Sequence, residues 1–494
     1  MSVLLTTSFT EELLSPLINA LDAVVFWDPF AAMGFQLRAK VPFIVLWLIS
    51  GAIFLTFRMR FVNIRCFKLA IDLVRGKYDK PGEAGEVSHF QALSTALSAT
   101  VGLGNIAGVA VAISVGGPGA TFWMIVAGLL GMTSKFTECT LGLKYRKINA
   151  SGEVSGGPMH YIPVAFGRLG LNKTGAFMAA LFSVLCVGGA LAGGNMLQAN
   201  QAFAQVTTQV PILEGNATMF GVLLALLTGS VIMGGLKGIA RVAEKIVPFM
   251  AMLYVGSALF IIFYNIDQMA SVAKLIFSEA FGSTAVQGGF LGVMMTGFRR
   301  AAFSNEAGIG SASIAHSAAK TDKPVSEGIV ALLEPFIDTV VICTMTALVI
   351  VFTGQYTTGN IEGTALTSRA FGSVISWFPY LLTVAVFLFA FSTMISWSYY
   401  GLKAWTYLFG EKTWVRHAYN LLFLTCTVMG CTLSLKAVTD LGDLMILAMA
   451  LPNMLALYIL HSEVKHDLKV YLVELKLGVF TKQASKQALR RDKE

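Results

Sequence analysis

A glycine-rich stretch with a single amide side chain, residues 100–108, interrupts an apolar segment of the chain. Its glycines Gly102, Gly104 and Gly108 weaken a helix, because glycine gives up more conformational freedom on folding than other residues. If this segment crosses a membrane, lipid offers no substitute partners for the backbone N–H and C=O groups that a break releases. The break is therefore expected only where these groups face protein or a water-filled cavity, and it predicts a binding site.

A second stretch, residues 305–308, repeats the Asn-x-Ala-Gly pattern of residues 105–108 inside another apolar segment. Interrupted membrane helices at equivalent places in two halves of a chain indicate the central site of a secondary transporter. A helix N-terminus at such a site favours a carboxylate, whereas C-terminal carbonyl groups favour a cation. This field suits a zwitterionic amino acid together with sodium, and it offers little to a sugar.

Within the first break, each polar or flexible residue has an expected role. We expect Gly102 and Gly104 to open the backbone to the substrate carboxylate, and the Asn105 amide to orient it. The alternative is a packing face from Gly104 to Gly108, because glycines four residues apart let membrane helices approach closely. The polar Asn105 side chain, which is costly in a membrane, favours the binding role.

Acidic residues also fall inside apolar segments, where carboxylates are expensive and usually line a pathway or pair internally. We expect Glu306, with its neighbour Asn305, to support the second break by accepting its free N–H groups, rather than to contact substrate. Glu334 and Asp338, at i and i+4, would share one helix face and could serve a proton route. Lys135 is expected to pair with the carboxylate three residues later, near the inner boundary of its span.

The composition is that of a polytopic membrane protein. Hydrophobic residues make up 55% of the 494 residues and charged residues only 13%, whereas a soluble chain carries about a quarter charged residues. The formal charge of +8 does not indicate nucleic-acid binding, because the basic residues lie in short segments between apolar runs. The six cysteines show no CxxC pairing and mostly lie in apolar segments, so they are expected to be buried structural thiols.

Apolar runs of at least about 20 residues predict an all-α protein with about eleven membrane spans. The expected spans are residues 41–57, 90–115, 119–143, 175–205, 217–235, 241–264, 286–317, 325–352, 371–407, 414–435 and 441–461. Alternate connections carry the lysines and arginines, which places the N-terminus outside and the C-terminus in the cytoplasm of a multi-pass plasma-membrane protein. In a Gram-negative source this would be the cell inner membrane.

The spans divide the chain into four expected parts. Residues 1–85 hold an amphipathic segment, one extra span and a basic cytoplasmic segment. Residues 86–264 and 265–463 form two five-span repeats of opposite orientation, each beginning with an interrupted helix. Residues 464–494 are expected to be a basic cytoplasmic tail.

Residues 116–124, Gly-Gly-Pro-Gly-Ala-Thr-Phe-Trp-Met, closely resemble the signature of the alanine or glycine:cation symporters. Further blocks that resemble this family lie at residues 104–110, 135–139, 155–159 and 303–308, within a resemblance that covers residues 90–410. The resemblance implies a leucine-transporter-type fold of the amino acid–polyamine–cation superfamily. It also implies sodium-driven uptake of small neutral amino acids. This sequence departs from the family pattern at Leu103, Ile125 and His160, and Leu103 lies in the break, where it could alter selectivity.

The resemblance also implies site residues. Gln198 matches a substrate-contacting position, and Phe303 and Trp397 resemble the aromatic walls of the pocket. The alternatives are an interhelical hydrogen bond for Gln198 and ordinary packing for the two aromatic residues. The expected substrate-binding set is Gly102, Leu103, Gly104, Asn105, Gln198, Phe303 and Trp397.

The fold that the resemblance implies places one sodium ion between the first broken helix and the eighth core helix. Sodium, like other hard cations, takes oxygen ligands. The expected ligands are the carbonyl groups of Ser98, Val101 and Phe389 and the hydroxyl groups of Ser392 and Thr393. The alternative is that the adjacent serine and threonine bond back to the preceding helical turn.

The function expected from these features is symport of alanine or glycine with sodium by alternating access. A proton-coupled amino acid transporter is the alternative, and a channel or a membrane-embedded enzyme is a remote one. The sequence contains no repeated filter motif and no HExxH motif. The expected partners are a small amino acid and the lipid bilayer, with no organic cofactor, nucleic acid or obligate protein partner.

Overall fold

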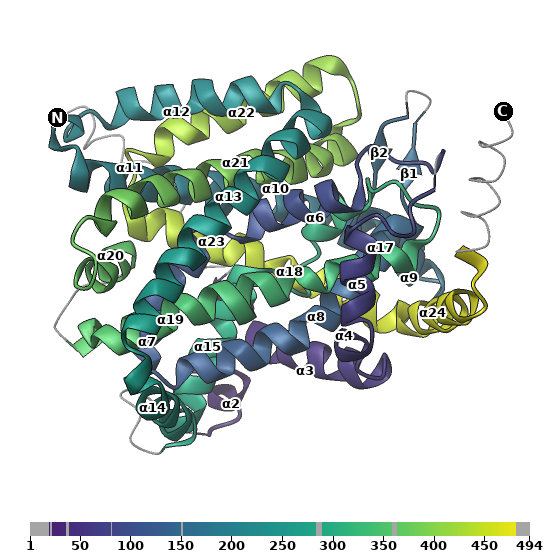
Figure 1. The fold of residues 1–494 in the computed structure, drawn as a ribbon. Helices are drawn as coiled ribbons and strands as arrows, with labels where there is room; N and C mark the ends of the chain where they lie inside the picture. The colour runs from purple at the N-terminus through teal and green to yellow at the C-terminus, as the bar shows by residue number, and fades with distance from the viewer. Residues whose placement is uncertain are drawn as a thin grey trace, which may run out of the picture.

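The computed structural model describes residues 22–35, 39–80, 82–149, 152–282, 289–357 and 363–480, together with residue 19. This part of the chain is a bundle of helices with one two-stranded antiparallel sheet (Figure 1). The sheet, the C-terminal part of α24 and the short helices α4 and α5 lie together at the right of the view. We call this the basic end, and it comprises residues 58–80, 144–149, 152–158, 317–324 and 462–480.

The helices and strands follow the chain in two runs. The first run comprises α2 (Pro29–Ala32), α3 (Phe43–Arg58), α4 (Val62–Arg65), α5 (Phe67–Val74), α6 (His89–Thr100), η1 (Leu103–Asn105), α7 (Ala107–Gly116), α8 (Ala120–Lys144), β1 (Lys147–Ile148), β2 (Val154–Ser155), α9 (Pro158–Gly167), α10 (Asn172–Leu191), η2 (Ala192–Met196), α11 (Leu197–Gln209), η3 (Pro211–Leu213), α12 (Ala217–Ile232) and α13 (Gly235–Tyr264). The second comprises η4 (Ile266–Gln268), α14 (Met269–Phe281), α15 (Gly289–Asn305), α16 (Ala312–His316), α17 (Pro324–Ala331), α18 (Leu333–Pro335), η5 (Phe336–Cys343), α19 (Thr344–Thr353), η6 (Gln355–Thr357), α20 (Thr364–Gly372), α21 (Phe378–Phe409), α22 (Thr413–Gly430), α23 (Leu435–Ala448) and α24 (Ala450–Lys476).

The predicted break in the first apolar segment is confirmed. Helix α6 begins with a capping box, in which the Ser88 hydroxyl accepts from the Gln91 N–H and the Gln91 amide accepts from the Ser88 N–H. It ends at Thr100, and the following helical segment is bent from it by 58°. The break between α6 and α7 spans residues 101–106 and contains the short 3-10 helix η1.

The second predicted break is also present, between α15 and α16. Its backbone enters the left-handed region at Glu306, Gly308 and Gly310, with φ angles of 54°, 86° and 97°. Only glycine adopts this region without a steric cost, which explains the two glycines. Both interrupted helices thus turn back into regular helix within six residues.

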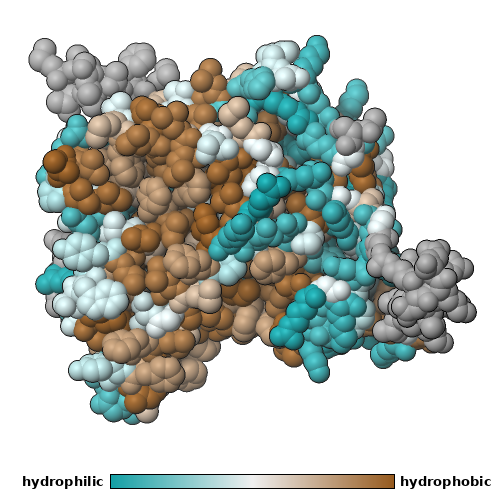
Figure 2. All heavy atoms as spheres, turned by 45° about the horizontal axis from the view of Figure 1, so that its top comes forward, coloured by the Kyte–Doolittle hydropathy of each residue, from teal (hydrophilic) through white to brown (hydrophobic). Residues whose placement is uncertain are grey.

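Five helical segments are long and apolar enough to cross a membrane, and the bent α6–α7 pair makes a sixth. The five are residues 172–209, 235–264, 324–353, 378–409 and 435–476. Two shorter apolar helices, α3 and α12, add to these. Hydrophobic side chains cover much of one face, and hydrophilic ones gather on its right-hand side (Figure 2). The architecture is that of a helical membrane protein, and eleven spans stay a prediction.

Several segments differ from the expectation. The expected connection before the second broken helix contains α14, and the one after residue 143 contains the sheet and α9. The span expected at residues 371–407 starts late, because α20 ends at Gly372 and α21 begins at Phe378. The expected tail begins inside α24, which continues to Lys476. Helices α9 and α14, with 10 and 13 residues, are too short to have been predicted as spans. Most of the expected amphipathic N-terminal stretch lies outside the described residues.

The cysteine prediction is confirmed. All six, Cys66, Cys139, Cys186, Cys343, Cys426 and Cys431, are buried and free.

Candidate substrate and ion site

The Asn105 side chain closes the first break on itself. Its Oδ1 accepts from the Gly102 N–H at 2.8 Å, and its Nδ2 donates to the carbonyl and to the carboxylate of Asp338 at 3.1 and 2.7 Å. The amide is fully buried. Its oxygen and its NH₂ group are therefore both hydrogen-bonded to other residues of the protein. This differs from the expected role of orienting a carboxylate directly. In this structure Asn105 positions the backbone of the break.

Asp338 joins the two broken helices. Besides Asn105, its carboxylate accepts from the hydroxyl of Ser304 at 2.8 Å and from that of Thr339 at 2.7 Å. Ser304 lies in the last turn of α15, next to the second break. Glu334, four residues earlier, has different hydrogen-bond partners, because its carboxylate accepts from Lys135 Nζ at 2.8 Å; a proton route through the two carboxylates stays a prediction. Asp338 therefore faces the breaks, whereas Glu334 faces α8.

Four of the five expected sodium ligands lie next to one another, where the end of α6 meets the middle of α21. The Thr393 hydroxyl donates to the Ser98 carbonyl at 3.1 Å, and the Ser98 hydroxyl donates to the Ser392 carbonyl at 2.7 Å. The Ser392 hydroxyl donates to the Phe389 carbonyl at 3.0 Å. The fifth, the Val101 carbonyl, accepts no hydrogen bond from any described residue. These oxygen atoms are the ligand type that sodium takes, in a site built without carboxylates.

The backbone of Gly102 lies against this group of oxygen atoms. A Cβ atom at Gly102 would lie 2.7 Å from Thr393 Oγ1 and 3.6 Å from Gln198 Oε1. A Cβ at Gly108, in contrast, would meet no atom within 4 Å. The alternative of a packing face from Gly104 to Gly108 is therefore wrong at Gly108, while the absence of a side chain at Gly102 is required by close contact.

Gln198 brings an unused acceptor to the same place. Its Nε2 donates to the Gly193 carbonyl at 3.0 Å, within the π-helical turn η2 that interrupts α10–α11. Its Oε1 is buried and has no hydrogen-bond partner among the described residues. A buried acceptor left unsatisfied costs about 1–3 kcal/mol, so this oxygen is suited to a donor that a ligand supplies.

The aromatic residue Trp397 is fully buried beside the same π-helical turn. A Cβ at Gly194 would lie 2.3 Å from its Cγ, so the indole packs directly on the Gly194 backbone. The other expected aromatic, Phe303, is partly buried and packs against the cluster that includes Met196 and Val438. Leu103 is buried within the first break. Gln198 on α11, Phe303 on α15 and Trp397 on α21 thus each lie at or beside an interruption in a helix.

The second break is supported differently from the expectation. Glu306 accepts hydrogen bonds from the Trp397 indole N–H at 3.2 Å and from the Ser311 hydroxyl, and not from the free backbone N–H groups. Asn305 takes that role, because its Oδ1 accepts from the Ala307 N–H at 3.0 Å and its Nδ2 donates to Thr339 at 2.9 Å. The sequence could not separate these roles, because either side chain can accept from a nearby N–H.

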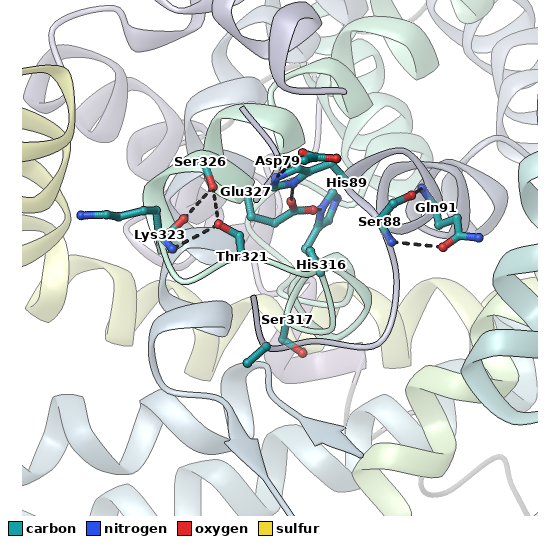
Figure 3. A network of polar contacts seen from close by, with 12 residues as sticks. Asp79, Ser88, His89, Gln91, His316, Ser317, Thr321, Lys323, Ser326 and Glu327 are labelled. Atoms are coloured by element: carbon teal, nitrogen blue, oxygen red, sulfur yellow. Dashed lines mark hydrogen bonds and ion pairs between the residues drawn. The ribbon is translucent and has the colours of Figure 1, made fainter. Parts of the chain in front are cut away.

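A second polar network lies between the breaks and the basic end (Figure 3). The Glu327 carboxylate on α17 contacts His89 Nδ1 on α6 and, at 2.5 Å, His316 Nδ1 on α16. The half-exposed Asp79 lies 3.8 Å from His89 Nε2, and Glu334 lies 3.5 Å from His316 Nε2. Glu327 therefore ties together one half of each broken helix. The sequence analysis missed all three core members, although each is a titratable residue in or beside an apolar segment.

The network continues to Lys135, whose Nζ donates to Glu334 at 2.8 Å and lies 3.8 Å from Glu138. The predicted pairing of Lys135 with Glu138 is present but is the weaker contact. Both side chains are fully buried within the protein. Glu138 in turn accepts from Asn453 at 3.2 Å, and Asn453 donates to the Gly308 carbonyl of the second break at 2.9 Å.

Two cavities flank the site along α11 and α21. One, of about 650 Å³, is lined by Gln205 and residues of α20, and the other, of about 240 Å³, is lined by Tyr399 and lies at the basic end. Gln205 follows Gln198 by seven residues and Tyr399 follows Thr393 by six, which corresponds to roughly 10 Å of helix in each case. About two helical turns of packed protein thus separate the site from either cavity.

The cavity at the basic end is bordered by an ion-paired cluster around Glu153. Its carboxylate accepts from Lys403 at 2.6 Å and from two nitrogens of Arg416 at 3.0 and 2.8 Å. Burial opposes ionisation of Glu153, but the hydrogen bonds from Arg416 and Lys403 outweigh it and lower the pKa to about 2. The cluster joins the hairpin to α21 and α22.

Glu153→Gln is expected to lower the thermal unfolding midpoint in detergent at pH 7. Because the folded-state pKa lies below the unfolded value, the stability from this carboxylate is present above about pH 4.5 and is lost as pH falls towards 2. The difference between variant and wild type should therefore shrink between about pH 5 and pH 3. Glu214→Gln, at an exposed position, is the control. A difference that stays constant over this pH range would contradict the prediction.

Comparison with known proteins identifies the family of this chain. Residues 32–486 match the family model described as the sodium:alanine symporter family. The chain belongs to the sodium:alanine symporter family. It is 38% identical over 434 residues to the sodium/alanine symporter AgcS of Methanococcus maripaludis, which covers 87% of this chain and 94% of that protein. It is 37% identical to the probable sodium/glutamine symporter GlnT of Bacillus subtilis, over 88% of this chain and 89% of that protein.

This member of the sodium:alanine symporter family also shares a fold with a solved transporter. The structure of MhsT in complex with L-phenylalanine matches 79% of this chain and 99% of that chain, with a TM-score of 0.53 and 16% sequence identity. At that identity the likeness concerns the fold alone. The expected membership and the leucine-transporter-type fold are confirmed, and the chain is a multi-pass membrane transporter.

Proposed function

We propose that this protein is a sodium-coupled symporter of small neutral amino acids, with alanine and glycine as substrates. The observation that carries this proposal is the juxtaposition at Gly102. The backbone of the break, the unsatisfied Oε1 of Gln198 and the hydroxyl of Thr393 converge there within 4 Å. The family and the sodium/alanine relative support the same substrate and ion.

The break supplies complementary ends for a zwitterion. The N-terminus of α7 favours the substrate carboxylate, because its first N–H groups have no partner within the helix. The Gln198 Oε1 is the acceptor that a substrate ammonium group would satisfy. We propose that Gly102, Leu103 and Gly104 form the carboxylate side of the site, with Asn105 holding its backbone.

Sodium would lie at the end of α6. We propose the carbonyl groups of Ser98, Val101 and Phe389 and the hydroxyl groups of Ser392 and Thr393 as its ligands. This position agrees with the negative C-terminal end of α6, which favours a cation. The ion and the substrate would then meet at Gly102, so binding of one would favour binding of the other.

Large buried side chains around the proposed site would limit the size of the substrate. Trp397 packs on Gly194 and hydrogen bonds to Glu306, so it is held in place from both sides. Phe303 and the buried Leu103 would limit the room further. A small pocket discriminates by excluding larger side chains, while each methylene adds only about 1–3 kcal/mol, so alanine and glycine should both be accepted.

Transport would occur by alternating access. The site has a cavity on each side and packed protein between, as expected for an occluded transporter. We propose that the five-span repeats, residues 86–264 and 265–463, rock against each other around the two breaks. The basic end would face the cytoplasm and the N-terminus the outside of the plasma membrane.

The decisive experiment is uptake of labelled alanine into proteoliposomes. An inward sodium gradient should drive accumulation above the outside concentration, whereas an equal potassium gradient should not. Excess glycine should compete and excess phenylalanine should not. Accumulation driven equally by a proton gradient without sodium would overturn sodium coupling. It would favour proton coupling, for which the chain of contacts from Asp79 through His89, Glu327 and His316 is the candidate path.

Gln198→Leu is expected to raise the KM for alanine by about tenfold to a hundredfold. Leucine is similar in shape to glutamine but lacks the Oε1 acceptor that would pair with the substrate ammonium group. The same uptake assay measures this. Gln268→Leu, at an exposed position in η4, should leave KM unchanged. An unchanged KM in Gln198→Leu would leave this side chain only its hydrogen bond to the Gly193 carbonyl in the same helical segment.

A further inference from the structure

A groove of about 700 Å³ lies at the basic end, between the segment that joins α3 to α4 and the C-terminal part of α24. No acidic side chain is among the described residues that line it. Six of the lining side chains are lysine or arginine, namely Arg58, Arg60, Arg65, Lys465, Lys469 and Lys476. This density of one charge sign in a single concave surface creates a positive potential that attracts an anion.

Helix α24 separates its charges between two faces. Its acidic residues point away from the groove: Glu463 pairs with Lys144 and Arg168, Asp467 with Lys144, and Glu474 with Lys323. Its lysines, spaced at i, i+4 and i+11, lie on the other face. The bundle therefore takes all of the acidic partners that α24 could offer, and leaves the lysines facing the groove.

The groove cations lack protein counter-charges. Arg60, Lys465, Lys469 and Lys476 form no ion pair with any residue that the structure describes. Arg58 reaches across to α24, where it donates to His461 at 2.8 Å and to Ser462 at 3.1 Å. Residues 481–494 carry five basic and two acidic side chains, so this segment has the wrong charge to fill the groove.

The groove also has an apolar border. Of the residues that line it, Val473 on α24 is 48% exposed. Phe57, Phe61 and Ile64, which are the sequence neighbours of the lining residues Arg58, Arg60 and Arg65, are 65%, 42% and 72% exposed. A basic patch beside exposed apolar side chains matches a ligand with an anionic head and hydrocarbon chains. A free inorganic anion would use only the first of these two features.

We propose that this groove binds an anionic phospholipid, with its phosphate among Arg60, Lys465 and Lys469 and its acyl chains along the exposed apolar side chains of α3 and α24. Basic pockets between helices at the cytoplasmic boundary are known to hold such head groups. The lipid would join the extra N-terminal helix to α24. The proposed orientation of the protein in the membrane determines which leaflet supplies the lipid. The proposed lipid site does not depend on which substrate the protein transports.

The test uses the full-length protein in detergent, with phosphatidylglycerol, phosphatidylcholine of the same acyl chains, or inorganic phosphate added. Phosphatidylglycerol should raise the thermal unfolding midpoint and remain bound in native mass spectrometry, whereas the other two should not. In the double variant Arg60→Gln, Lys469→Gln, lipid affinity should fall by about fivefold per charge removed. The matched control, Lys173→Gln with Lys274→Gln, removes two exposed charges elsewhere and should leave affinity unchanged.

A charge-preserving variant, Arg60→Lys with Lys469→Arg, should keep the lipid and shows whether the positions tolerate substitution. Equal stabilisation by phosphatidylcholine, equal loss of binding in the control variant, or full competition by inorganic phosphate would each overturn the proposal. If the neutral double variant does not fold, the single variant Lys469→Gln decides the question: a loss of lipid affinity of about fivefold supports the proposal, and an unchanged affinity overturns it. Alanine uptake in each folded variant separates failure of this site from failure of the transport proposal.

Discussion

Gly102→Ala is expected to reduce sodium-driven alanine uptake by about tenfold to a hundredfold. The new Cβ would lie 2.7 Å from Thr393 Oγ1, closer than such atoms approach in folded proteins, and Thr393 is stiff because it is β-branched. Overpacking of this kind costs about 1–3 kcal/mol. The displaced hydroxyl is a proposed sodium ligand, so the half-saturating sodium concentration should rise before the KM for alanine does.

The matched control for this experiment is Gly108→Ala in the same interrupted helix. Nothing lies within 4 Å of a Cβ at Gly108, and alanine favours helix more than glycine does. Uptake by Gly108→Ala should therefore equal or exceed that of wild type. Similar losses in both variants would mean that the glycines act only through helix flexibility, and would remove the close contact from the proposed mechanism.

Glu327→Ala is expected to lower the free energy of unfolding by about 3–5 kcal/mol, the cost of removing one partner from a buried charged group. Its carboxylate is the shared partner of His89 and His316, and all three side chains are nearly or fully buried. Without it, one half of each broken helix loses its connection to α17 (Figure 3). Thermal unfolding in detergent and the yield of monodisperse protein measure the effect.

Glu327→Gln should lie between wild type and Glu327→Ala, because the amide can still accept from one histidine while donating to the other. The control is Glu474→Ala, which breaks the partly exposed pair with Lys323. A pair of that kind contributes about 0–1 kcal/mol. If Glu327→Ala were no more destabilising than Glu474→Ala, the network would not hold the broken helices together.

The interruptions themselves could be predicted from the sequence. Residues 101–106 and 306–311 break helices because glycine and paired polar residues weaken a helix locally, and this effect needs no tertiary contact. Burial of the cysteines followed from apolar surroundings in the same way. Helix α14 and the extension of α24 to Lys476 could not be found by the same reasoning, since α14 has only 13 residues and charged residues interrupt the apolar residues of the extension.

The assignment of roles within the breaks was less accurate. Asn105 was expected to face the substrate, but its amide holds the Gly102 N–H and Asp338. Glu306 was expected to accept backbone N–H groups, but it accepts from Trp397, and Asn305 makes the backbone contact. In each case the side chain had several possible partners within reach. The sequence lists these possibilities, and only the packing of neighbouring helices selects among them.

The sequence by itself determined that this is a multi-pass helical protein with two broken helices, because composition and local helix propensity act along the chain. The tertiary structure alone decided which polar groups meet. It brought Ser98 to Thr393 and His89 to Glu327, pairs separated by more than two hundred residues. It also sorted the charges of α24 between the bundle and the groove. The physical reason is that a buried polar group must find a partner wherever the fold places one, and spacing along the chain carries no record of that choice.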